Sequence, residues 1–301
     1  ITTFSAKFFL PSNPSALGGA FALVPAAASA WALAEYFCAR RRLLLPSIVL
    51  CTAFCGSVGL AASLIFGDNA VRDIETATGP LRALGNLGIV GGLSTAGAAL
   101  MFFIRFRLPF ALFVLALALA AAAYAGMAFL GDTRMVIGGT LALMIGLATL
   151  AAAVFLDMGD PQRTTRQADF AFWLHLAAAP QIILGLRGMT LGFFGADAST
   201  ATAIIALCAL LGFGVVSLAL NRRALIVSSL MTYSVAISAL ASEMGLGVMN
   251  TTIVTLLILG GAVVLIGGGW STARRVVLMV LPSGGLFDRL FPPEPKALAT
   301  G

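Results

Sequence analysis

Charged residues and histidine are scarce in this chain of 301 residues. Only 10% of the residues are charged and a single histidine is present, whereas 60% are hydrophobic and the mean hydropathy is +1.02. A water-soluble domain could not cover so much apolar surface, so the composition excludes one. We predict an all-α protein in a bilayer, because an isolated helix satisfies its own backbone hydrogen bonds there.

Metal ligands and catalytic motifs are equally few. The four cysteines lie in or at the ends of apolar runs, without a nearby cluster of histidines or acids: Cys38, Cys51, Cys55 and Cys208. We therefore expect neither a disulfide framework nor a metal site.

No phosphate-binding GxxxxGK[ST] loop or HExxH motif is present in the sequence. A serine protease built on Ser57 would need His175 within about 3 Å, yet the two are predicted roughly 22 and 9 Å from the cytoplasmic face. We leave enzymatic activity open, with the balance against it.

Nine apolar runs are long enough to cross a membrane as helices. They lie near residues 15–38, 43–66, 83–104, 109–130, 134–156, 169–187, 199–220, 224–242 and 248–270. We predict a polytopic transmembrane helical bundle in which residues 1–270 form a single domain. Residues 271–301 would form a cytoplasmic interfacial segment with a proline-rich tail.

The basic residues between these runs alternate from side to side. Thirteen of them share one predicted side: Arg40, Arg41, Arg42, Arg105, Arg107, Arg163, Arg166, Arg222, Arg223, Arg274, Arg275, Arg289 and Lys296. The positive-inside rule places this side in the cytoplasm, so the first residue would be periplasmic and the C-terminus cytoplasmic. The opening "ITTFSAKFFLPSNP" lacks a signal-peptide pattern, which predicts a further helix upstream and ten spans in total. The net charge of +6 thus fits an anionic membrane face, and we predict no nucleic-acid partner.

Ionisable side chains inside a membrane need a partner, a cavity or a short route to the headgroups. Glu35 lies about 7 to 8 Å inside Arg40, and His175 lies about 9 Å inside Asp169, at 1.5 Å per residue. We predict a polar layer in the cytoplasmic leaflet with Glu35 and His175 as its ionisable members, and with Ser47, Ser228 and Ser229 at similar depth. Gln181 is a further candidate site residue, because its amide can hydrogen-bond backbone groups that Pro180 leaves free. The alternative is that Glu35 reaches its own arginines and His175 is an ordinary core histidine.

Small residues surround both ionisable groups at helical spacing, which predicts that both helix faces point into the bundle. The face of His175 would hold Ala168, Ala171, Ala178, Ala179 and Ile182. The face of Glu35 would hold Ala27, Ala28, Trp31, Cys38 and Ala39.

Prolines and glycines within the runs mark bends and close contacts. Pro180 removes one backbone donor and frees the carbonyl of Leu176, so a local helix break is predicted there, and Pro25 is a similar position. Gly88 and Gly92 form a small-xxx-small pattern that predicts helix packing.

No cofactor is predicted. His175 is the single residue that could bind a haem or a bacteriochlorophyll, because "AFWLH" places an alanine four residues before it, as in light-harvesting polypeptides.

Four phrases of the chain resemble a group of uncharacterised polytopic membrane proteins of proteobacteria: "WALAEYFCARRRLLLPS" at 31–47, "ADFAFWLHLAAAP" at 168–180, "NRRALIVSSL" at 221–230, and "LFPP" near the C-terminus. The resemblance implies a bacterial inner-membrane location among membrane lipids and implies no activity. The leading hypothesis is a transporter-like protein for a small solute or lipid. The alternative is a non-catalytic accessory or scaffold subunit of a larger membrane complex.

Overall fold

The computed structural model describes residues 16–75, 80–129, 135–160, 164–191, 212, 214–222, 225, 247–281 and 291. Every regular element in these ranges is a helix, as the composition predicts. The chain divides into two compact units, Ile1–Ile145 and Gly146–Gly301.

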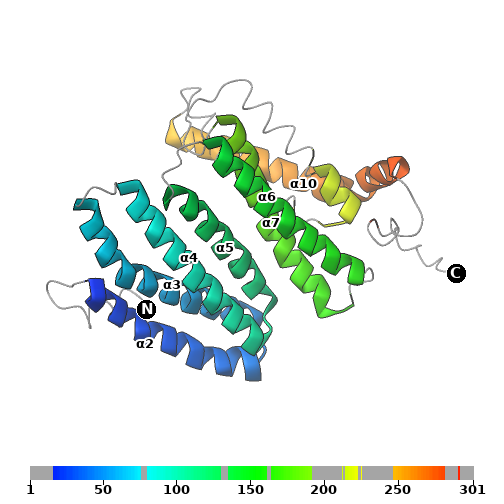
Figure 1. Cartoon of the computed structure of the whole chain (residues 1–301). Coiled ribbons are helices and arrows are strands. Elements are labelled where there is room, and N and C mark those ends of the chain that lie inside the picture. The colour runs from blue at the N-terminus through cyan, green and yellow to red at the C-terminus, as the bar shows by residue number, and fades with distance from the viewer. Residues whose placement is uncertain are drawn as a thin grey trace. The chain divides into compact units, whose positions relative to one another are not determined.

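The first unit contains four long helices and one short π-helix, drawn in blue to teal in Figure 1, together with the first part of α6 (Met135–Gly159). In chain order these are α2 (Ala16–Ala34), the π-helix η1 (Glu35–Arg40), α3 (Leu44–Glu75), α4 (Pro80–Phe106) and α5 (Pro109–Phe129). Helix α2 packs on α3, α3 on α4, and α4 on α5. The turns before α3 and α5 have only two or three residues, so each helix packs beside the next one in the chain.

The turns before α3 and α5 share a backbone conformation that arginine rarely adopts. Arg42 and Arg107 have φ angles of 52° and 50°, in the left-handed region that favours glycine. The N–H of Arg107 donates to the carbonyl of Phe103 at 2.7 Å, which closes α4 by a left-handed C-terminal cap. The turn before α3 follows the π-helix η1. In this turn the N–H of Leu43 donates to the carbonyl of Phe37, in η1, at 3.1 Å.

Close helix packing in the first unit occurs at glycines. A Cβ at Gly92 would lie 2.8 Å from Cβ of Ala122 and 3.0 Å from the carbonyl oxygen of Ala118, so α4 and α5 approach backbone to backbone there. A Cβ at Gly88 would lie 2.5 Å from Cβ of Ala125. The glycines bring the helices closer than larger side chains would allow, since packing between membrane helices depends on van der Waals contact.

The second unit contains the end of α6 (Met135–Gly159), α7 (Arg166–Leu191), a helical segment at 214–220 and α10 (Val248–Val280). Helix α7 continues through Pro180 without interruption, as α2 does through Pro25. A Cβ at Gly146 would lie 2.7 Å from the backbone nitrogen of Ile182, so α6 and α7 are in direct backbone contact.

Six of the described helices are long and apolar enough to cross a membrane, and they correspond to the first six predicted spans. Large apolar side chains on them are exposed, among them Phe21 at 72%, Leu45 at 75% and Phe155 at 76%. Such a surface suits lipid rather than water. The predicted spans at 199–220 and 224–242 fall largely outside the described residues. The run at 248–270 lies in α10, which extends ten residues beyond Trp270.

Candidate functional site: a partly buried carboxylate shared by histidine and arginine

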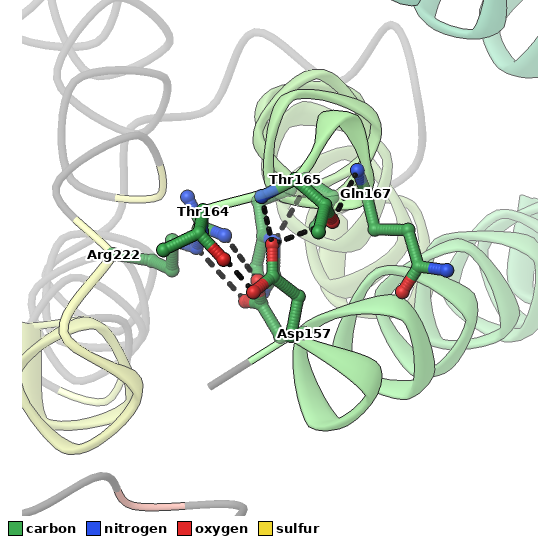
Figure 2. Close-up of polar contacts among 8 residues, drawn as sticks. Asp157, Thr164, Thr165, Gln167 and Arg222 are labelled. Carbon is green, nitrogen blue, oxygen red and sulfur yellow. Dashed lines mark hydrogen bonds and ion pairs between the residues drawn. The ribbon is translucent and has the colours of Figure 1, made fainter. Parts of the chain in front are cut away.

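Asp157 lies near the C-terminal end of α6, where its carboxylate faces two cationic or potentially cationic side chains. Nε2 of His175, on α7, lies 3.7 Å from Oδ2 of Asp157. Arg222 donates from Nε to the same oxygen at 2.9 Å and from Nη2 to Oδ1. Figure 2 shows the two dashed contacts between Arg222 and Asp157. The three side chains, which we call the shared-carboxylate site, all belong to the second unit.

The imidazole of His175 has a defined orientation. Its side chain is 0% exposed, and Nδ1 lies 2.7 Å from the carbonyl oxygen of Ala171, one turn earlier on α7. A carbonyl oxygen can only accept a hydrogen bond, so Nδ1 carries a proton. In the neutral ring Nε2 then presents a lone pair toward the carboxylate. Protonation of Nε2 would replace this unfavourable contact by a charge-assisted hydrogen bond.

Arg222 is held by the turn that ends the helical segment at 214–220. Asn221 has a φ of 53°, the N–H of Arg222 donates to the carbonyl of Ser217 at 2.9 Å, and the N–H of Asn221 donates to that of Leu218 at 3.2 Å. These two bonds are the Schellman pattern, in which a left-handed residue closes a helix. The hydroxyl of Ser217 also donates to the carbonyl of Arg222. The guanidinium therefore reaches Asp157 from a restrained backbone.

Helix α10 packs against this same turn through two side chains. Nε1 of Trp270 donates to Oδ1 of Asn221 at 3.1 Å, and Nε of Arg274 donates to the carbonyl of Leu218 at 3.2 Å. Both Trp270 and Arg274 are buried. Helix α10 therefore contacts the turn that carries Arg222, at Asn221 and Leu218.

A second aspartate organises the connection between α6 and α7. The carboxylate of Asp160 accepts hydrogen bonds from the N–H of Thr164 at 3.1 Å, and from the N–H and hydroxyl of Thr165 at 2.8 and 2.7 Å. The hydroxyl of Thr165 in turn accepts the N–H of Gln167 at 3.3 Å and caps α7 (Figure 2). Asp160 thus sets the start of the helix that carries His175.

The first unit holds a separate and more exposed ion pair. Nη2 of Arg105 lies 2.6 Å from Oε2 of Glu35, with side chains 52% and 36% exposed. Glu35 is the first residue of η1, and π-helical turns often occur at functional positions. Beneath the pair an aromatic cluster packs with ring centroids 4.5 to 6.0 Å apart: Trp31, Phe54, Phe102 and Phe106.

The predicted face of His175 is confirmed. Ala168, Ala171, Ala178, Ala179 and Ile182 are all buried, together with His175 itself. The predicted face of Glu35 is wrong in part, because Ala28 and Ala39 are exposed and the buried line of α2 includes Ala30 and Ala34. The π-helical turn adds a residue per turn, which moves Ala39 off the α-helical stripe, whereas Ala28 precedes η1 and is not explained by it.

The remaining predicted site residues have different environments. Gln181 is buried, and Oγ1 of Thr149 lies 3.5 Å from its Oε1, so it joins α7 to α6. Ser228 and Ser229 lie outside the described residues. Glu35 and His175 belong to different units and have partners within their own units, so their predicted shared layer stays a prediction.

Sequence reasoning overlooked Asp157 and assigned Arg222 only to a basic loop. The signal for Asp157 was available, because it is an acid at the end of a strongly apolar run, as Glu35 is. Nothing in the sequence indicates that Arg222 and Asp157 meet, since 65 residues separate them.

The nitrogen of His175 that a haem or pigment would need already faces another side chain. With Nδ1 engaged by Ala171, Nε2 is the nitrogen left to bind a metal, and it faces the carboxylate of Asp157 in a fully buried position. In the part of the chain that the structure describes, no three histidine, cysteine, aspartate or glutamate side chains gather as a metal site would require.

The fold and the spans define a multi-pass helical membrane protein. Comparisons with protein-family models, curated proteins and solved structures find no match for this chain. Its function must therefore be argued from the shared-carboxylate site.

Proposed function

We propose that the protein is a proton-coupled transporter for a small solute or lipid in the bacterial inner membrane. The single observation that carries the proposal is that one partly buried carboxylate, that of Asp157, faces both His175 and Arg222. Ionisable groups at such positions in membrane helices are expensive, and they commonly mark proton or substrate pathways.

Proton binding at His175 would change which cation Asp157 holds. A protonated Nε2 becomes a donor 3.7 Å from Oδ2, the oxygen that already accepts Nε of Arg222. Two cations then compete for one carboxylate, and their mutual repulsion weakens the hold on Arg222. Because Arg222 belongs to the turn that contacts α10 through Trp270 and Arg274, proton binding would loosen that contact.

The proposal includes the membrane topology expected from the charges. Nine spans, with the thirteen basic residues in the cytoplasm, would place the connection between α6 and α7 on the cytoplasmic side. The shared-carboxylate site would then exchange protons with the cytoplasm, since Asp157 is two residues from the end of the span Gly139–Gly159.

The test uses inside-out membrane vesicles from cells that produce the full chain. Respiration acidifies the vesicle lumen, and a pH-sensitive acridine dye reports the gradient while a panel of organic cations, anions and lysolipids is added. We expect at least one compound class to dissipate the gradient with the wild-type protein, and His175→Gln and Asp157→Asn to abolish this response. Arg275→Gln, which removes an exposed arginine of α10, is the matched control and should respond normally. A response unchanged in His175→Gln would overturn proton coupling through this site.

The alternative function, an accessory subunit, is favoured by a different observation. Helix α10 has 33 residues, and large apolar side chains along it are exposed, including Leu257 at 75% and Met279 at 80%. At 1.5 Å per residue such a helix is about 50 Å long, more than the hydrocarbon core requires. A partner helix would cover this flank. Mass spectrometry of the protein extracted gently from its native membrane should then find one stoichiometric partner protein, whereas a transporter working alone should be recovered without one.

A further inference from the structure

Two basic turns lie at one end of the first unit. The exposed arginines of these turns, which we call the arginine rim, are Arg40, Arg41, Arg42, Arg105 and Arg107. The ion pair between Glu35 and Arg105 joins the first residue of η1 to the end of α4, so the helix ends that lead into the two turns are neighbours in space. Five arginines against one carboxylate leave the rim strongly cationic.

The arginine rim lies at the ends of the candidate membrane spans, next to exposed apolar side chains. Candidate spans end at Arg40 and Phe106, and others begin at Leu44 and Pro109. Leu44, Leu45 and Ile104 next to the arginines are exposed at 57%, 75% and 68%. A cation that adjoins exposed apolar side chains at a span end lies at the depth of lipid headgroups.

The backbone gives an independent reason to assign the rim a role beyond the turns themselves. Arg42 and Arg107 occupy corresponding positions with φ near +50°. Glycine adopts this conformation without steric cost, and it is the usual residue there. Arginine at both positions is therefore unfavourable for the backbone, and its benefit must come from the side chain.

We propose that the arginine rim binds the phosphate of an anionic phospholipid headgroup. Guanidinium groups donate paired hydrogen bonds to phosphate oxygens, and the neighbouring leucines and Ile104 contact the acyl chains. Glu35 fixes the side chain of Arg105 at the end of α4. This proposal does not depend on proton coupling, because the rim and the shared-carboxylate site belong to different units.

The experiment uses the double variant Arg42→Gly/Arg107→Gly of the full chain. Glycine suits both turns, so the variant removes two charges and relieves the backbone, and it should fold at least as well as wild type in neutral detergent. Native mass spectrometry would measure the affinity for short-chain phosphatidylglycerol, with phosphatidylcholine of the same chains as the neutral lipid. We expect about fivefold weaker binding per arginine, or about 25-fold for the pair, and little change for phosphatidylcholine.

Three controls distinguish the outcomes. Arg275→Gln removes an exposed arginine elsewhere and should leave phosphatidylglycerol binding unchanged. Arg42→Lys/Arg107→Lys should keep the attraction of the two charges but lose the paired hydrogen bonds, so its affinity should lie between those of wild type and the glycine variant. Inorganic phosphate at the same concentration should not compete. Wild-type affinity in the glycine double variant, an equal loss in Arg275→Gln, or full competition by inorganic phosphate would each overturn the assignment of a lipid headgroup to the rim.

Discussion

At the residue scale, two ion pairs among the described residues, Asp157 with Arg222 and Glu35 with Arg105, differ in burial and therefore in energetic role. The side chains of Asp157 and Arg222 are only 14% and 9% exposed, whereas those of Glu35 and Arg105 are 36% and 52% exposed. Removing one member of a buried pair leaves the other charge uncompensated, which costs far more than loss of a solvated pair. Asp157 and Arg222 should thus contribute both to stability and to the proposed proton response.

Removing Arg222 tests this difference. Arg222→Gln should lower the free energy of unfolding by about 3 to 5 kcal/mol, because it leaves the carboxylate of Asp157 buried without its bidentate partner. Arg105→Gln, the control at the exposed pair, should change it by less than about 1 kcal/mol. Titration with SDS in mixed micelles would measure both values, and equal losses would show that Asp157 and Arg222 are not a buried pair.

The orientation of the imidazole can be tested directly, because His175 is the one histidine of the sequence. In protein labelled with ¹⁵N-histidine and carrying no histidine tag, the neutral ring should have its proton on Nδ1, since this nitrogen faces the carbonyl of Ala171. Nitrogen chemical shifts at high pH report the tautomer. A ring protonated on Nε2 would contradict the arrangement with Asp157.

At the scale of secondary structure elements, the helices pack through positions that have no side chain. Helix α4 contacts α5 at Gly88 and Gly92, and α6 contacts α7 at Gly146. By contrast, a Cβ at Gly97, also on α4, would meet nothing within 4 Å. Gly92 lies in a tight helix contact and Gly97 does not, so substitution of each by alanine should have opposite effects on the stability of the protein.

Gly92→Ala should destabilise the protein by about 1 to 3 kcal/mol, because its methyl group would overlap Ala122 and force α4 from α5. Gly97→Ala should be neutral or should stabilise α4 by up to about 1 kcal/mol, since alanine has the higher helix propensity. The same SDS titration would compare them. Similar effects of the two substitutions would count against the close approach of α4 to α5.

At the scale of the whole molecule, the distribution of arginine determines the expected threading through the bilayer. The thirteen basic residues on one predicted side outnumber the five on the other, and this bias sets orientation during insertion. The proposed access of the shared-carboxylate site to the cytoplasm depends on this threading.

Cysteine labelling tests the threading in a chain whose four native cysteines are replaced by alanine. Thr164→Cys, in the connection between α6 and α7, should react with a membrane-impermeant maleimide only in inside-out vesicles. Thr78→Cys, between α3 and α4, should react only in intact spheroplasts. Labelling of the two cysteines from the opposite sides would invert the topology and remove the proposed cytoplasmic access.

Local patterns predicted the helices and the buried face of α7, because hydrophobic length and helical spacing act within one segment. The π-helical turn at Glu35 was not predicted, since a residue inserted into a helix leaves no periodic signal in a short apolar run. The left-handed backbone conformation of Arg42 and Arg107 was also not predicted, because glycine and asparagine are the residues usually found at such positions.

The sequence by itself determined that the chain is helical and that its helices are long and apolar enough to cross a membrane, because composition and run length decide how a backbone can be satisfied in lipid. Only the tertiary structure decided that Asp157 is the partner of His175 and Arg222. That choice depends on how α6, α7 and the turn at Asn221 pack, and interactions between residues so far apart in the chain are not encoded in any local pattern.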